Sequence, residues 1–183
     1  MKKSLMLALA LLILLAASGC GYNTSIALQE KVEAQWAQVD VQLKRRFDLL
    51  PNLIETVKGY AAHEKEVFTA LADARKGYFA AGTREEKIKY ATQMESSLSR
   101  LLMFKETYPA LKADESFRKL QDTLEGTENR ISVERNRYND AVRELNTYIR
   151  GIPGQWWAGM AGVKGAEYFK IDEADKAVPK VKF

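Results

Sequence analysis

Apolar residues recur every three or four positions through the first half of the chain, a spacing typical of one helix face. This stripe comprises Leu28, Val32, Trp36, Val39, Leu43, Phe47 and Leu50. Its phase continues beyond Pro51 in Ile54, Val57, Ala61, Phe68 and Leu71. Because a proline inside a helix removes a hydrogen bond and clashes with the preceding turn, we expect a break near Phe47, with Asp48 capping a new helix. The continuous phase favours the alternative, a helix that only kinks.

The same kind of periodicity predicts further helices downstream. The first two helices are expected over about 26–47 and 50–80. Thr83 and Glu86 have the spacing of a capping box, in which each residue bonds the other's backbone, so a third helix starts there. That third helix is expected to stop before Pro109, since the residue before a proline disfavours helical geometry.

A seven-residue repeat marks the fourth predicted helix, which Asp114 or Ser116 caps and which reaches about Arg150. The repeat comprises Phe117, Leu124, Ile131, Tyr138, Leu145 and Ile152. The positions three residues later are Leu120, Thr127, Glu134, Ala141 and Tyr148. Such a repeat is typical of a helix-bundle seam. The sequence therefore predicts an all-α fold, an antiparallel four-helix bundle of long helices over residues 26–150.

The N-terminus has the features of a bacterial lipoprotein signal. Two lysines precede a 13-residue apolar run, residues 5–17, which is shorter than the ~20 residues that a spanning helix needs. Small residues then lead into Cys20. We expect a signal peptide over 1–19, acylation of Cys20 and a lipidated tether over 20–25, which would hold the domain on the extracytoplasmic (periplasmic) side of a membrane. An uncleaved short anchor is the alternative.

Composition excludes several classes of function. The net charge of +4 falls to +2 without the two leader lysines, since 26 basic residues then face 24 acidic ones. This balance predicts no nucleic-acid binding. One cysteine and one histidine, His63, allow no disulfide within the chain and no metal site built on several such ligands. We expect no cofactor and no metal.

A polar stripe runs beside the apolar one, at helical spacing if the phase survives Pro51. It comprises Arg45, Asp48, Asn52, Glu55, Gly59 and His63. A solvated face is one interpretation, and a surface for a partner is the other.

Helix geometry also suggests a polar layer inside the bundle. At ~1.5 Å per residue, the arginines at 45 and 46 reach the level of acids in the fourth helix if the helices alternate in direction. We expect Arg45 or Arg46 to meet Glu125, Glu128 or Glu134. Such a layer either fixes helix register or forms an interface. The residues assigned to it are Asp40, Arg45, Arg46, Asp48, Asn52, Glu55, Glu125, Glu128, Asn129, Arg130 and Glu134.

Residues 151–183 are expected to form a Gly/Trp loop followed by an irregular tail. In the predicted bundle this loop lies at the membrane end, where Trp156 and Trp157 suit the lipid interface. The alternative is a loop that folds back to cap the bundle core. The final residues, 181–183, have the form that carboxylate-capturing, strand-adding domains accept, which is a short and weak signal.

Several of these stretches resemble the LemA family of bacterial membrane-associated helical proteins. The matching residues are Trp36, 38–40, 45–46, 48–53, 55–60, 124–131, 138–139 and 153–169. The resemblance covers nearly all of residues 24–183. It implies an N-terminal membrane anchor, an α-helical bundle outside the cytoplasm and no established biochemical activity. Many LemA relatives use a spanning helix as the anchor, from which this chain departs.

The sequence carries no nucleophile elbow, phosphate-binding loop or dinucleotide-binding motif. We therefore expect a non-enzymatic interaction or scaffold protein, anchored through acylated Cys20 and bound to a protein partner or to itself. Two alternatives stay open: a ligand-binding bundle or hydrolase that uses the mid-bundle arginines and acids, and a membrane-shaping protein. Gly21 after the cysteine favours the outer membrane over the inner one.

Overall fold

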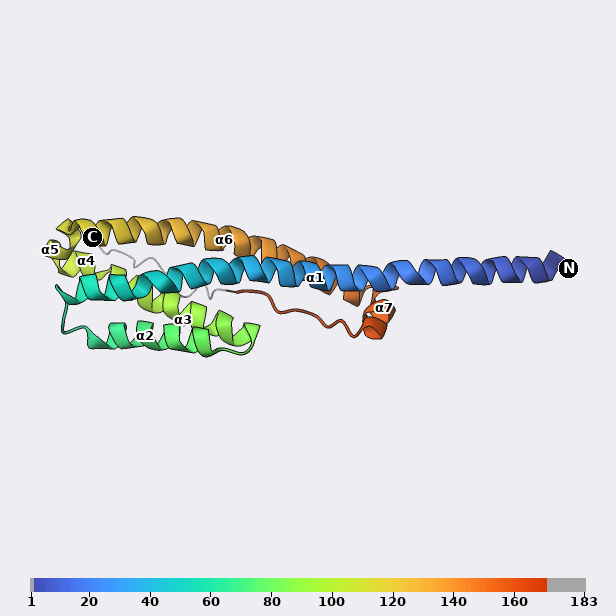
Figure 1. Ribbon diagram of the computed structural model, residues 1–183, viewed down its shortest axis with the longest axis horizontal. Coiled ribbons are helices and arrows are strands. Elements are labelled where there is room, and N and C mark those ends of the chain that lie inside the picture. The colour runs from blue at the N-terminus through green and yellow to red at the C-terminus, as the bar shows by residue number, and fades with distance from the viewer. Residues whose placement is uncertain (1, 171–183) are drawn as a thin grey trace, which may run out of the picture. The chain divides into compact units, whose positions relative to one another are not determined.

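Helices dominate the computed structural model, which describes the backbone of residues 2–170 and the side chains of residues 21–170 (Figure 1). The helices are α1 Lys2–Lys58, α2 Lys65–Ala80, α3 Arg84–Leu102, α4 Phe104–Thr107, α5 Pro109–Ala113, α6 Glu115–Arg150 and α7 Gly154–Ala161. The predicted all-α class is confirmed for this part of the chain. The side chain of Cys20 and those of the predicted signal peptide lie outside the described residues, as does the tail from residue 171.

The described residues form two compact units. The first unit contains residues 2–39 and 134–168, and the second contains residues 40–133 with 169–170. Helices α1 and α6 each contribute to both units. Among the described residues, none of the helices is both long enough and apolar enough to cross a membrane.

Helix α1 continues through Pro51 to Lys58, so the predicted break near Phe47 is wrong. Pro51 has no N–H to donate to the carbonyl of Phe47, four residues earlier. The Nε of Arg75, from α2, donates to that carbonyl instead, at 3.2 Å. The apolar face also stays buried on both sides of the proline, with Phe47 and Leu53 fully inaccessible to solvent. Burial and a substitute donor therefore keep the helix intact.

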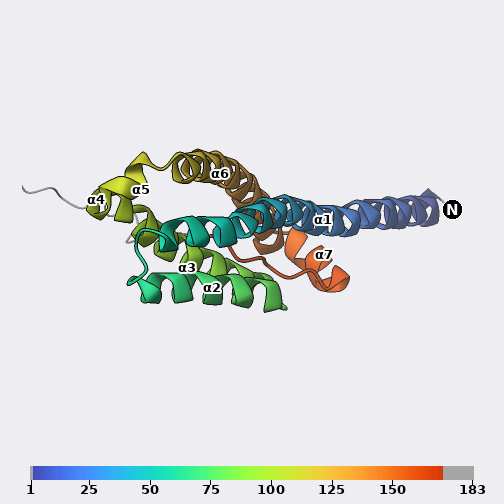
Figure 2. The same cartoon turned by 60° about the vertical axis from the view of Figure 1, so that its left-hand side comes forward.

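The chain turns after α1 and enters a helical hairpin in the second unit. Backbone bonds from Tyr60 and Ala61 to the carbonyl of Val57, both at 2.9 Å, close the turn. Helices α2 and α3 then lie side by side, joined by a short loop (Figure 2). A Cβ at Gly77 of α2 would lie 2.2 Å from the Tyr90 ring of α3, so glycine permits their close approach.

The predicted start of the third helix is confirmed, since Thr83 and Glu86 form a complete capping box at the start of α3. The predicted length of that helix is wrong, because α3 stops at Leu102 and two short helices, α4 and α5, follow. Of the two caps proposed for the fourth helix, Asp114 accepts a hydrogen bond from the backbone N–H of Phe117 at 2.7 Å. This bond satisfies one of the free donors at the start of α6.

Most of the seven-residue repeat on α6 is buried. Phe117, Leu124, Ile131, Tyr138 and Leu145 are each at most 2% exposed. Ile152 is 75% exposed, so the repeat ceases to be a seam after Leu145.

The predicted Gly/Trp loop instead contains helix α7, which belongs to the first unit. Gly154 lies so close to α6 that a Cβ would come within 2.1 Å of the Tyr148 carbonyl oxygen. Gly162, with φ of 70°, ends α7 in the left-handed conformation that favours glycine. The glycines therefore serve close packing and helix termination.

Candidate functional site

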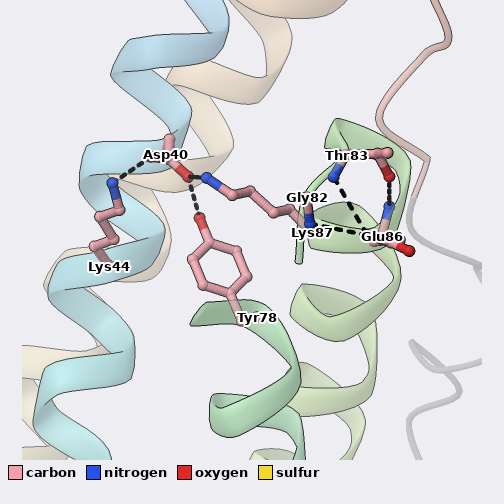
Figure 3. A network of polar contacts seen from close by, with 7 residues as sticks. All are labelled: Asp40, Lys44, Tyr78, Gly82, Thr83, Glu86 and Lys87. Atoms are coloured by element: carbon pink, nitrogen blue, oxygen red, sulfur yellow. Dashed lines mark hydrogen bonds and ion pairs between the residues drawn. The ribbon is translucent and has the colours of Figure 1, made fainter. Parts of the chain in front are cut away.

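Asp40 of α1 is the centre of a polar cluster in the second unit (Figure 3). Its carboxylate accepts hydrogen bonds from the Tyr78 hydroxyl at 2.6 Å and the Lys87 ammonium at 2.8 Å. Lys44, one turn further along α1, lies 2.7 Å from the second carboxylate oxygen. The Asp40 side chain is only 13% exposed. Three donors from α1, α2 and α3 thus converge on one carboxylate.

The surroundings of Asp40 fix its protonation state. Burial raises the pKa of this carboxyl, but the hydrogen bonds from Lys44, Lys87 and Tyr78 outweigh burial and bring it down from 3.8 to about 2. Burial, and then the bond to Asp40, raise the pKa of Tyr78 well above its usual value. Asp40 therefore stays ionised and Tyr78 stays protonated at neutral pH. A carboxylate with so low a pKa is a poor general base, so this arrangement suits the joining of three helices.

The α3 capping box explains why Lys87 reaches Asp40. The backbone N–H groups of Gly82 and Thr83 donate to the Glu86 carboxylate at 3.0 and 3.2 Å, and Glu86 donates its own N–H to the Thr83 hydroxyl (Figure 3). This pairing fixes the first turn of α3, on which Lys87 is the next residue. The Lys87 ammonium also lies 5.6 Å from the centre of the Tyr78 ring, a favourable cation–π distance.

Arg46 forms another polar contact of this unit, an ion pair with Glu128 of α6. The Arg46 side chain is 8% exposed, whereas that of Glu128 is 34% exposed. The predicted meeting of an arginine at 45 or 46 with one of the three acids is therefore confirmed for Arg46 and Glu128. Its neighbour Arg45 is exposed.

The predicted polar stripe keeps its phase through Pro51 to Glu55 and faces solvent, but Gly59 and His63 lie in the turn beyond the end of α1. Its exposed members are Arg45, Asp48, Asn52, Glu55, Gly59 and His63. Asp48 lies 3.4 Å from the guanidinium of Arg75, and Glu55 lies 3.1 Å from the ammonium of Lys58. Both are surface pairs, which contribute little stability. The ion pairs of the stripe therefore contribute little to the stability of the fold.

The remaining residues assigned to the layer do not join α1 to α6. They contact neighbours in their own helix or are exposed. Glu125 accepts a bond from Gln121 at 3.0 Å, one turn earlier in α6. Asn129 and Arg130 are exposed. Glu134 belongs to the first unit and pairs with Arg137 at 2.8 Å. The structure therefore assembles only part of the predicted layer.

A groove that the sequence did not predict lies in the second unit, between the end of α1 and α2. Its volume is about 710 Å³. The apolar lining comprises Leu50, Pro51, Ile54, Ala62, Phe68, Leu71 and Ala72. Its charged lining residues are Glu55, Lys58, Lys65 and Arg75. Glu55, a member of the polar stripe, thus stands at the edge of an apolar groove rimmed mainly by cations.

Tyr78 and Lys87 are the other residues that sequence reasoning missed. Tyr78 continues the α2 spacing of Leu71 and Ala74, so its burial could have been found. Its bond to Asp40, 38 residues away, has no local signal.

The two tryptophans assigned to membrane contact differ in environment. Trp156 is 64% exposed. Trp157 is only half-buried, and its indole ring lies against α1, since a Cβ at Gly21 would come within 2.1 Å of that ring. The two tryptophans, for which the sequence predicted the same role, therefore differ in exposure and in contacts.

The sequence profile described as the LemA family matches residues 35–183, most of the chain and both compact units. The chain belongs to the LemA family. The family match includes α6 and α7 as well as the part of α1 that carries Asp40 and Arg46. It confirms the resemblance found in the sequence motifs.

Curated relatives of this LemA chain include Magnetosome protein MamQ 1 and MamQ 2 of Paramagnetospirillum magneticum, each 26% identical over 175 residues. Magnetosome protein MamQ of Magnetospirillum gryphiswaldense is 25% identical over 174 residues. Each alignment covers 81% of this chain and 64% of the relative. The chain thus spans less than two thirds of the length of these relatives, whose names state no reaction.

Proposed function

We propose that this LemA-family protein is a membrane-anchored, non-enzymatic interaction module that binds a helical segment of a partner protein. The groove between α1 and α2 carries this proposal. Its floor is apolar and open, as expected of a surface that receives the apolar face of an amphipathic helix. Three of its four charged residues are basic. The partner segment therefore bears acidic residues beside its apolar face.

The polar contacts of the second unit support different roles for its buried and its exposed polar residues. Asp40 and Arg46 are already paired with Tyr78, Lys87 and Glu128, which favours a structural role for both over ligand binding or hydrolysis. The exposed stripe beside the groove makes only surface pairs. Its side chains can thus exchange those pairs for bonds to a partner at little cost in stability.

The anchor is the second part of the proposal. The apolar run at 5–17 and the small residues before Cys20 support acylation of that cysteine and retention on the extracytoplasmic side of a membrane. The intact domain is proposed to be an antiparallel four-helix bundle of α1, α2, α3 and α6. Metabolic labelling with palmitate tests the anchor: we expect incorporation into the wild type and none into Cys20→Ala. Equal labelling of both would contradict acylation at this site.

Photo-crosslinking from the groove tests the binding function. A benzophenone side chain at Thr69, an exposed residue that lines the groove, is activated in native membranes. We expect one crosslinked protein, lost when Ala72→Glu places an acid in the groove against an acidic partner. The matched control is Ala110→Glu, at an exposed position of α5 outside the groove. Equal crosslinking in both variants, or none from the wild type, would overturn the assignment.

A further inference from the structure

Helix α7 presents an apolar face to solvent. Trp156 is 64% exposed and Met160 71% exposed, and their spacing of four residues places them on one side of the helix. Ile152, in the turn between α6 and α7, is also exposed, at 75%. The opposite side of α7 packs inward through Gly154 and Ala158. An exposed group of three large apolar side chains marks an interaction surface.

The first unit holds α7 beside the part of α1 that follows the apolar N-terminal run. The Trp157 indole lies against Gly21. The Tyr148 hydroxyl, at the end of α6, donates to the Gly21 carbonyl at 2.8 Å. These contacts hold the junction of α6 and α7 at the level of Gly21 on α1.

Gly21 lies close to the membrane under either form of the proposed anchor. If Cys20 is acylated, Gly21 is the next residue. If the apolar run stays in the bilayer as an uncleaved helix, Gly21 is four residues past its last alanine, or about 6 Å along the axis. The headgroup region is about 5–7 Å thick on each side of the hydrocarbon core. The position of α7 thus coincides with the lipid interface.

The chemistry of this face agrees with its position. Tryptophan is enriched at the level of the lipid headgroups. Arg150 before α7 and Lys164 after it are both exposed, and basic side chains around an apolar face attract anionic lipid. We infer that Ile152, Trp156 and Met160 insert into the surface of the bilayer that holds the anchor. Trp157 has a different role, because it positions α7 against α1.

The inference rests on the membrane anchoring proposed above and is tested in the same membrane. Full-length protein is reconstituted into vesicles of phosphatidylcholine and phosphatidylglycerol, with bromine atoms on the acyl chains in half of the samples. Trp156→Phe is compared with the wild type, so that the fluorescence difference reports Trp156 apart from Trp36 and Trp157. We expect this difference signal to be quenched by brominated lipid and protected from acrylamide in the water.

Three outcomes are informative. If the Trp156 signal is quenched by acrylamide and not by brominated lipid, the face stays in water and the inference is wrong. If neither agent quenches it, protein covers the face, as in a second copy of this chain, and the lipid assignment is equally wrong. If the protein does not float with the vesicles at all, membrane anchoring itself fails.

Two further variants separate insertion from folding. Met160→Ser removes an exposed apolar side chain of α7 and should move the Trp156 signal toward acrylamide quenching. Met103→Ser is the matched control, because Met103 is 54% exposed in the second unit. We expect the control to leave the quenching unchanged. Equal shifts from both variants would contradict a specific lipid contact.

Discussion

Arg75 donates the hydrogen bond that Pro51 cannot. Its Nε lies 3.2 Å from the carbonyl oxygen of Phe47, the acceptor that an ordinary residue at position 51 would satisfy from its backbone N–H. Arg75 also lies 3.4 Å from Asp48 and packs over the ring of Phe79, 5.0 Å from its centre. One side chain of α2 thus replaces the backbone hydrogen bond of α1 that the proline removes.

We expect Arg75→Met to lower the free energy of unfolding by about 1–2 kcal/mol, because a buried carbonyl then loses its donor. In a Pro51→Ala background the same change should cost less than half as much, since the alanine N–H bonds the Phe47 carbonyl. Urea unfolding of the four proteins in this double-mutant cycle measures the coupling. Equal costs in both backgrounds would show that Arg75 acts only through its other contacts.

Asp40 predicts a pH dependence of stability. Its pKa is lowered to about 2 in the folded protein from 3.8, so the folded state favours the ionised form. The resulting stabilisation, about 2 kcal/mol, is complete above pH 4 to 5 and is lost as the pH falls toward 2. We expect Asp40→Asn to destabilise the protein by about this amount at pH 7 and much less at pH 2.5.

Chemical unfolding at both pH values provides the measurement for Asp40. Asp48→Asn is the control, because Asp48 is exposed and its ion pair with Arg75 contributes little. If the destabilisation caused by Asp40→Asn did not change with pH, the lowered pKa of Asp40 would not be its cause.

Tyr78→Phe removes one of the three donors to Asp40 and should lower the free energy of unfolding by about 1 kcal/mol.

The pair of Arg46 and Glu128 predicts an asymmetry between single and double substitutions. Glu128→Gln leaves the Arg46 guanidinium buried without its counter-charge, and we expect a cost of about 2–3 kcal/mol, reduced by the partial exposure of Glu128. Replacing both residues, as Arg46→Leu with Glu128→Leu, should recover most of that loss, since no buried charge is then left without its partner. Denaturant midpoints of Glu128→Gln, of Arg46→Leu and Glu128→Leu alone, and of the double variant provide the measurement. A double variant as unstable as the sum of its single variants would argue for a larger polar network.

Local signals in the sequence predicted local structure well. The Thr83–Glu86 capping box was recognisable because donor and acceptor are three residues apart, and Asp114 was one of two candidate caps for the fourth helix. The contact of Arg46 with Glu128 was also accessible, because helix rise alone places distant residues at the same level. These features depend on spacing, which the sequence displays directly.

Other features depend on partners that spacing does not reveal. The continuous apolar phase favoured an unbroken α1 at Pro51, but it gave no sign of Arg75, the donor to the Phe47 carbonyl, which lies 24 positions later and on another helix. The lowered pKa of Asp40 requires Tyr78 and Lys87, which come from two further helices. The groove arises because α2 packs beside the end of α1. The sequence of either helix by itself does not predict it. The segment expected to be a Gly/Trp loop instead contains α7, because Gly154 allows this helix to pack on α6.

Gly154 and Gly159 of α7 provide a matched pair for a final prediction. A Cβ at position 154 would lie 2.1 Å from the Tyr148 carbonyl oxygen, a backbone atom that cannot move aside without shifting the helix. A Cβ at position 159 would meet nothing within 4 Å. We expect Gly154→Ala to displace α7 and raise the rate of amide hydrogen exchange in residues 154–163. Gly159→Ala should slow that exchange, because alanine loses less conformational entropy in a helix, an advantage of about 0.5–1 kcal/mol.

Hydrogen exchange followed by mass spectrometry distinguishes these two results. The exchange of α2 and α3, which belong to the second unit, serves as the internal control and should be unchanged in both variants. If Gly154→Ala and Gly159→Ala had the same effect, close packing of α7 on α6 would not determine its stability. The Trp156 face is presented by this packing, so Gly154→Ala should also expose Trp156 to acrylamide in vesicles, whereas Gly159→Ala should leave it protected.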